Sequence, residues 1–215
     1  MKYFVKTPIW LRWMYPNYLW KMKDTEKVIY LTFDDGPHAT ASPFVLDILA
    51  KYNAKATFFC IGKNVEEYGE LYNRILGEGH SVGNHTQNHL KGWKTDNEVY
   101  INNVKQAAKF ISSNLFRPPY GRIKRFQAKV LMQELNEEGK TKPYKIVMWS
   151  VLSGDFDTML SGQKCADNVI NNTDRGSIVV FHDSAKAFDR LKVALPQVLE
   201  FFTKEGFRFE AIPQS

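Results

Sequence analysis

Cysteines, long apolar runs and clusters of basic residues are scarce in this chain of 215 residues. The two cysteines, Cys60 and Cys165, are too few for a disulfide-bonded scaffold, and their separation provides no Cys-x-x-Cys motif for structural zinc or thiol exchange. No apolar stretch approaches the about 18 residues of a transmembrane helix. Although the formal net charge is +6, lysines and arginines occur singly or in pairs, so the sequence predicts no nucleic-acid partner.

From the first residues of the sequence as written, we also expect no export signal. Arg12 and Pro16 interrupt the apolar residues there before any run reaches the about seven residues that a signal peptide requires. The sequence as written therefore predicts a cytoplasmic protein, and it gives no indication of the oligomeric state.

Residues 1–25 differ from the rest of the chain because aromatic side chains are concentrated there. One interpretation of this segment is an anchor on a membrane surface. Pro8 and Pro16 would interrupt a long amphipathic helix, however, so we expect the rings to cover the bottom of the folded domain, without stable membrane insertion. We therefore divide the chain into an aromatic N-terminal segment, 1–25, packed on a single domain, 26–215.

What the sequence does contain is short β-branched or aromatic runs that alternate with amphipathic stretches. This alternation is typical of a parallel sheet surrounded by helices. Seven such runs are candidate strands: Val28–Phe33, Ala56–Cys60, Ser81–Asn84, Leu115–Arg117, Lys145–Trp149, Ser177–His182 and Phe207–Ala211. The sequence predicts an α/β fold, a distorted (β/α)7 barrel of parallel strands in a single domain, with an open doubly wound sheet as the alternative.

Polar side chains follow most of these strands, and active groups in α/β barrels come from the carboxyl ends of strands. The first strand leads into Asp34-Asp35-Gly36-Pro37, two adjacent carboxylates and a turn. Consecutive strand residues point in opposite directions, so the two acids should have different tasks. A solvent-exposed turn would account for the same four residues.

Two of the five histidines, His85 and His89, lie four residues apart after the third strand. On a helical turn they would share a face, and both imidazoles could reach one metal ion. Two imidazoles and one carboxylate leave coordination positions open for water, which suits a catalytic divalent ion such as zinc. For His38 and His80 we expect no catalytic role, and we interpret both as structural or as side chains that support the site residues.

Two later strand ends carry groups suited to acyl-transfer chemistry. The fourth strand leads into Arg117-Pro118-Pro119-Tyr120-Gly121, a rigid turn that would leave the Tyr120 N–H free as an oxyanion donor. A stiff connection with Arg117 in solvent is the alternative. The sixth strand ends in His182-Asp183, and a carboxylate from a neighbouring strand end would keep this histidine protonated, as a general acid must be.

In this order, the segments resemble the motifs of the polysaccharide deacetylases, the carbohydrate esterase family 4 with its NodB-homology domain, over roughly residues 28–212. The Thr-Phe-Asp-Asp-Gly-Pro and His-x-x-x-His elements are the most specific. The resemblance implies a distorted seven-stranded barrel and a metal-dependent hydrolase that removes N-acetyl groups from an N-acetylated sugar or oligosaccharide. Two other interpretations stay open: a related amidohydrolase acting on a small amide or imide, and a carbohydrate-binding domain without activity.

The resemblance also implies roles for five catalytic residues. Asp34 resembles the catalytic base, and Arg117 would orient it by a charge-assisted pair. His182 resembles the general acid that protonates the leaving amine, and Asp155 would orient it. The Tyr120 N–H would help to hold the oxyanion.

For the metal, the resemblance implies three ligands, Asp35, His85 and His89, and one divalent ion, zinc or else cobalt or another transition metal. Two positions depart from the family pattern. Phe156 stands where the family usually has Trp, and Val180 stands where it usually has Leu. Both keep an apolar wall, but they leave the shape of the acyl pocket open, so the sequence does not identify the sugar.

Overall fold

The computed structural model describes residues 3–23, 25–133 and 143–214. Its centre is a sheet in the order β5-β4-β3-β2-β1-β7-β6, with β8 paired to β1, and every pairing between these strands is parallel. The strands are β1 (Val28–Asp34), β2 (Ala56–Cys60), β3 (Ser81–Asn84), β4 (Leu115–Phe116), β5 (Lys145–Ile146), β6 (Val151–Leu152), β7 (Ile178–His182) and β8 (Arg208–Phe209).

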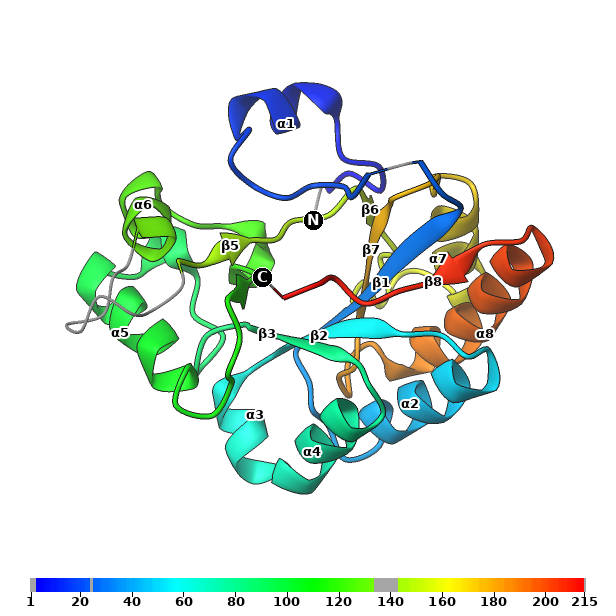
Figure 1. Cartoon of the computed structure of the whole chain (residues 1–215), viewed down its shortest axis with the longest axis horizontal. Coiled ribbons are helices and arrows are strands. Elements are labelled where there is room, and N and C mark those ends of the chain that lie inside the picture. Colours follow the sequence, from blue (N-terminus) through cyan, green and yellow to red (C-terminus); the bar gives the residue numbers. More distant parts are fainter. Residues whose placement is uncertain (1–2, 24, 134–142, 215) are drawn as a thin grey trace.

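Helices surround this curled sheet, except for α1, which stands at one edge of the molecule (Figure 1). They are α1 (Ile9–Met14), α2 (Ala41–Lys51), α3 (Gly62–Glu67), α4 (Gly69–Gly77), α5 (Asn97–Ala107), α6 (Arg125–Gln133), α7 (Gly162–Ile170) and α8 (Phe188–Lys204), with short 3-10 turns η1 (Gly92–Lys94) and η2 (Pro119–Gly121). The expected α/β fold, a distorted barrel of parallel strands, is confirmed. The amphipathic stretch 124–138 also predicts a helix; α6 is the part of it that is described, and residues 134–138 lie outside the described part of the chain.

Alternation along β1 determines what faces the barrel interior. Ile29, Leu31 and Phe33 are fully buried in the core between sheet and helices. The intervening side chains point the other way, because successive residues of a strand face opposite sides of the sheet. Thr32 and Asp34 therefore lie on the inner side, where both contact Arg117. The apolar alternate residues thus fix which carboxylate faces the interior.

The predicted fifth strand, Lys145–Trp149, is wrong in its second half. Only Lys145–Ile146 forms β5 beside β4, and the chain then crosses to β7 and pairs with it as β6. At the crossing, the Val147 N–H donates to the Phe116 carbonyl at 2.8 Å and the Ser150 N–H donates to the Ile178 carbonyl at 3.0 Å. One extended segment thus connects both edges of the sheet, and periodicity cannot reveal a change of partner within such a segment.

The N-terminal segment forms main-chain hydrogen bonds with residues 146–152, the crossing segment that leads from β5 to β6. The Leu19 N–H donates to the Ile146 carbonyl at 2.9 Å, and the Met148 N–H donates to the Leu19 carbonyl at 2.8 Å. Further along, the Leu152 N–H donates to the Val5 carbonyl at 2.8 Å. These bonds are consistent with a segment packed on the domain, while the proposed boundary after residue 25 stays a prediction.

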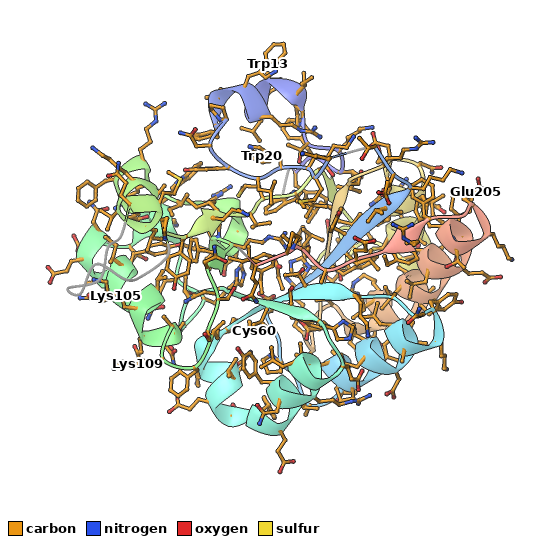
Figure 2. The ribbon with its side chains drawn as sticks, in the orientation of Figure 1. Trp13, Trp20, Cys60, Lys105, Lys109 and Glu205 are labelled. Atoms are coloured by element: carbon orange, nitrogen blue, oxygen red, sulfur yellow. The ribbon has the colours of Figure 1, made fainter. Side chains whose placement is uncertain are left out.

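The aromatic rings of this segment are not all covered. Trp20 is buried, but Trp10 and Trp13 are 50% and 74% exposed, and Trp13 points away from the body of the molecule (Figure 2). Leu11 and Tyr15, one helical turn apart, pack against the domain, as does Tyr18. The expectation that the rings cover the domain is therefore wrong for the two exposed tryptophans. Within the described residues, no helix is both long and apolar enough to cross a bilayer.

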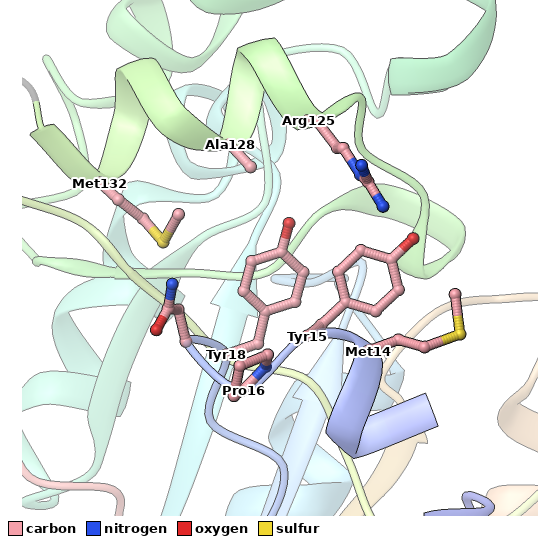
Figure 3. Close-up of a pocket in the computed structure, with 8 residues that line it drawn as sticks. Met14, Tyr15, Pro16, Tyr18, Arg125, Ala128 and Met132 are labelled. Carbon is pink, nitrogen blue, oxygen red and sulfur yellow. The ribbon is translucent and has the colours of Figure 1, made fainter. Parts of the chain in front are cut away.

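A pocket lies between this segment and α6 (Figure 3). The rings of Tyr15 and Tyr18 stack there, with centroids 5.3 Å apart and planes 15° apart. Its other lining residues are Met14, Pro16, Asn17, Arg125, Ala128 and Met132. None of these is a predicted site residue, so the pocket is distinct from the site that the strand ends form.

Candidate active site

The residues expected to carry the chemistry come together at the carboxyl ends of neighbouring strands. Asp34 ends β1 and His182 ends β7, and the two are register partners. His85 follows β3, Arg117 follows β4 and Asp155 follows β6. Because parallel strands end at the same edge of the sheet, residues far apart in sequence meet there.

Asp35, His85 and His89 form a compact cluster, with one potential ligand atom from each, all within 4.8 Å of one another. The Nε2 atoms of His85 and His89 lie 3.6 and 3.1 Å from Asp35 Oδ1. The expected helical turn at residues 85–89 is wrong. The segment is a loop in which Thr86 and His89 have positive φ values of 66° and 54°, and this loop brings the two imidazoles together.

The hydrogen bonding around this cluster fits a cation. His85 Nδ1 lies 2.7 Å from the Arg117 carbonyl, to which it can only donate, so Nε2 keeps its lone pair. Burial lowers the pKa of His85 to about 4, which keeps the ring neutral. Asp35 Oδ1 is shielded from solvent and, apart from the two imidazoles that face it, has no hydrogen-bond partner among the described residues. Three electron-pair donors thus face one another, as ligands of a divalent ion do.

Asp34 is held by a buried arginine. Both side chains are buried, and Arg117 Nη1 lies 2.7 Å from Asp34 Oδ1 and 2.7 Å from Thr32 Oγ1. The other guanidinium nitrogens donate to the carbonyls of Val147 at 3.1 Å and Met148 at 3.0 Å. Arg117 is therefore not in solvent, and its rigid fork fixes the position of the carboxylate.

His182 and Asp155 form the second charged pair. His182 Nδ1 lies 2.7 Å from Asp155 Oδ1, and the His182 main-chain N–H donates to Oδ2 at 2.8 Å. Burial disfavours the charged imidazolium, but the Asp155 carboxylate and its hydrogen bond outweigh this, with help from Asp35 and Asp34, and raise the pKa of His182 to about 9. The ring is thus protonated at neutral pH and leaves Nε2 available to a substrate.

Tyr120 lies beside the cluster, with its ring centroid 4.6 Å from that of His89. Its φ of 60° places it in the left-handed region, at the turn that the two prolines stiffen. Among the described residues, no acceptor pairs with the Tyr120 N–H. A main-chain donor without a protein partner is thus located at the rim of the site.

Sequence reasoning missed residues that hold the turn after β1. Asp35 has a φ of 79°, and Asn64 Nδ2 donates to its carbonyl at 2.7 Å. The buried Asp183 accepts from the Gly36 N–H at 3.1 Å and from the Ser42 hydroxyl, and burial raises its pKa to about 8. The Asp-Gly-Pro turn signalled that something must secure this loop, but no local pattern identifies partners so distant in sequence.

The remaining histidines agree with the structural interpretation. His38 Nδ1 accepts from the main-chain N–H groups of Thr40 and Ala41 at the start of α2. His80 Nδ1 accepts from the Ala56 N–H at 3.2 Å, and burial lowers the pKa of His80 to about 4. Each ring therefore satisfies backbone donors away from the cluster.

Comparison with known proteins gives a consistent assignment. Residues 21–137 match the sequence model of the polysaccharide deacetylase family. A peptidoglycan-N-acetylglucosamine deacetylase of Bacillus cereus is 35% identical over 201 residues, covering 91% of this chain and 91% of that protein. A chitooligosaccharide deacetylase of Rhizobium leguminosarum bv. trifolii is 29% identical, covering 88% of this chain and 92% of that protein.

Among solved structures, the Bc1960 peptidoglycan N-acetylglucosamine deacetylase in complex with 4-naphthalen-1-yl-N-oxidanyl-benzamide superposes with a TM-score of 0.81 and 29% sequence identity. The match covers 96% of this chain and 95% of that chain, so it includes the whole barrel and not only its central strands. The sequence and fold comparisons point to the same family. The chain belongs to the polysaccharide deacetylase family.

Proposed function

We propose that this protein is a metal-dependent hydrolase that removes the N-acetyl group from an N-acetylated sugar or oligosaccharide and releases acetate. The observation that carries the proposal is the meeting of three groups at one end of the barrel. They are the Asp35, His85 and His89 cluster, the buried Asp34–Arg117 pair and the Asp155–His182 pair. Amide hydrolysis needs a Lewis acid, a base and a proton donor together. The cluster would hold a metal ion as the Lewis acid, and the two pairs would supply the base and the proton donor.

Asp35, His85 and His89 would hold one divalent ion, zinc or else cobalt or another transition metal. Nitrogen and carboxylate ligands that leave coordination positions open suit such an ion. When bound, the ion supplies Lewis acidity to the acetyl carbonyl and makes water more acidic.

The protein's own residues then divide the proton transfers. Asp34 accepts a proton from the attacking water, and Arg117 keeps the carboxylate oriented for this step. As the new C–O bond forms, the Tyr120 N–H donates to the developing oxyanion. His182 Nε2 gives its proton to the amide nitrogen as the C–N bond breaks, so acetate and a free amine leave.

The substrate class rests on the relatives, which are named for N-acetylglucosamine in peptidoglycan and for chitooligosaccharides. We propose a sugar with an acetamido group, in a soluble oligosaccharide or a glycan precursor. A cytoplasmic location, which would favour such substrates over assembled cell wall, is part of the proposal, and cell fractionation checks it.

The experiment is acetate release from a panel of N-acetylated sugars, oligomers and peptidoglycan fragments, alongside small amides and imides. We expect release from the sugars alone, loss of activity with a chelator, and recovery on adding back zinc or cobalt. Hydrolysis of imides without hydrolysis of sugars would favour the related amidohydrolase. Binding of the sugars without turnover under every metal condition would indicate a binding domain.

A further inference from the structure

The N-terminal segment reaches the loop that carries Asp155. Residues 5–7 run antiparallel to the crossing segment, with the isolated bridge between Lys6 and Val151 at their centre. The hydrogen bond from the Leu152 N–H to the Val5 carbonyl continues this pairing toward the active end of the barrel. Because the two segments are antiparallel, residues before Val5 lie beside the chain after Leu152. This direction places Tyr3 at the turn formed by residues 154–157.

Tyr3 contacts this turn with both its ring and its hydroxyl group. The ring centroid lies 5.1 Å from that of Phe156, with planes 60° apart, and the hydroxyl donates to Asp157 Oδ2 at 3.1 Å. Burial and the hydrogen bond to Asp157 raise the pKa of Tyr3 to about 12, so the hydroxyl stays a donor. Phe156 in turn packs edge-on against His182, with ring centroids 5.4 Å apart and planes 71° apart. A continuous series of contacts therefore connects Tyr3 to His182.

The Tyr3 hydroxyl group is also part of the hydrogen bonding within the turn. Asp157 Oδ1 accepts from the Met159 N–H at 3.1 Å, so the carboxylate joins the turn to Tyr3. Gly154, at a φ of 82°, is close enough that a Cβ built there would lie 3.0 Å from the Tyr3 hydroxyl oxygen. Between Gly154 and Phe156 lies Asp155, the partner of His182, so the turn that Tyr3 contacts carries two side chains that contact the imidazole.

We propose that Tyr3 is a positioning residue for the general acid. Its contacts with Phe156 and Asp157 hold the 154–157 turn, and with it the Phe156 ring, in place beside His182. Tyr3, supplied from the N-terminal segment, packs on one side of the Phe156 ring and keeps it against the imidazole. This inference rests on the proposed function, since it requires His182 to protonate the leaving amine.

The test compares two leaving groups. An amide leaves only when its nitrogen receives a proton, whereas an aryl acetate such as 4-nitrophenyl acetate leaves as a phenolate without a proton donor. For Tyr3→Ala we expect kcat on an N-acetylated oligosaccharide to fall about 10- to 100-fold, the range for a catalytic group displaced by about 1 Å, with little change in KM. Aryl acetate hydrolysis should change little. Equal losses on both substrates, or no loss on either, would overturn the proposal.

Matched variants separate positioning from folding. Phe4→Ala removes the neighbouring ring, which is 59% exposed, and should leave both activities at the wild-type level. Tyr3→Phe keeps the ring and loses the bond to Asp157, so its amide kcat should lie between wild type and Tyr3→Ala. The double variant Tyr3→Ala/Phe156→Trp should regain amide turnover over Tyr3→Ala, because the larger ring fills the space. No gain in the double variant would contradict the packing role even if Tyr3→Ala folds poorly.

Asp34→Asn distinguishes this inference from the proposed function. If wild type releases no acetate from sugars, or Asp34→Asn keeps wild-type turnover on both substrates, the proposed function fails and the inference fails with it. If Asp34→Asn is inactive on both substrates and Tyr3→Ala keeps the wild-type ratio of amide to ester turnover, the proposed function stands and Tyr3 has no positioning role.

Discussion

Asp34 and Asp35 are adjacent and chemically identical, yet their surroundings differ completely. Asp34 is the last residue of β1 and faces the barrel interior, where Arg117 holds it. Asp35 has turned into the left-handed region and faces the two imidazoles. Although burial opposes ionisation, the neighbouring imidazoles, His89 first, hold the pKa of Asp35 well below its ordinary value. This difference in surroundings supports our proposal that Asp34 acts as the base and Asp35 as a metal ligand.

We predict that Asp34→Asn keeps its metal and loses turnover. The amide cannot accept a proton from water, so kcat should fall by about 10²- to 10⁴-fold with little change in KM. Asp35→Asn should instead lose metal affinity, because a neutral carbonyl attracts a divalent ion less strongly, and excess metal should restore part of the activity. Turnover of both variants across a zinc or cobalt titration measures the difference. Rescue of Asp34→Asn by excess metal would show that the assignment is reversed.

The pH dependence of turnover should report His182. Its pKa is raised to about 9, so the general acid is present below that pH and turnover should fall as the pH rises through it. In Asp155→Asn, burial is no longer offset by the carboxylate, so the pKa of His182 should fall and the basic limb should move to lower pH. A pH profile of kcat at saturating metal checks this. Glu200→Gln, which removes an exposed carboxylate paired with Lys204, is the control and should not move the limb.

At the scale of elements, the loop after β1 depends on α3. Asn64, inside α3, donates to the Asp35 carbonyl, so Asn64→Ala leaves the left-handed turn less secure. We predict a loss of about 0.5–1.5 kcal/mol in the free energy of unfolding, the usual contribution of one hydrogen bond, together with weaker metal binding. Asn172→Ala breaks a similar bond to the Asn168 carbonyl and should cost stability alone. Denaturant unfolding measures the loss of stability in each variant, and metal titration measures its metal affinity. Equal metal affinity in Asn64→Ala and Asn172→Ala would show that the bond from Asn64 to Asp35 does not support metal binding.

Strand ends were predictable from the sequence because apolar alternation locates a strand and polar residues mark where it stops. Two elements could not be predicted. The crossing from β5 to β6 changes hydrogen-bond partner within one extended run, which leaves no periodic signal. The loop from His85 to His89 brings the imidazoles together through positive φ at Thr86 and His89, although neither is glycine, the residue that usually marks such backbone.

At the scale of the whole molecule, the aromatic N-terminal segment is hydrogen-bonded to the barrel at two places. They are the crossing segment between β5 and β6 and the turn at 154–157. Neither contact was predictable, because residues 3 and 157 are far apart in the chain and no local motif pairs them. The predicted boundary after residue 25 is drawn on composition alone and stays a prediction.

We predict that removing residues 1–20 lowers both stability and amide turnover. The main-chain groups of Ile146, Met148 and Leu152 would lose their hydrogen-bond partners, and the turn at 154–157 would lose its contacts with Tyr3. Thermal unfolding and acetate release of the truncated chain check this. A truncated protein with the wild-type unfolding midpoint and wild-type turnover would show that the segment is dispensable.

The central claim is that Asp35, His85 and His89 bind the one divalent ion on which deacetylation depends. Metal analysis of the purified protein, combined with acetate release from an N-acetylated oligosaccharide, tests it most directly. We expect one equivalent of zinc or cobalt per wild-type chain. The folded His85→Ala/His89→Ala variant should contain neither metal nor activity. A double variant that retains a full equivalent of metal, or a metal-free wild type that still releases acetate at the normal rate, would contradict the claim.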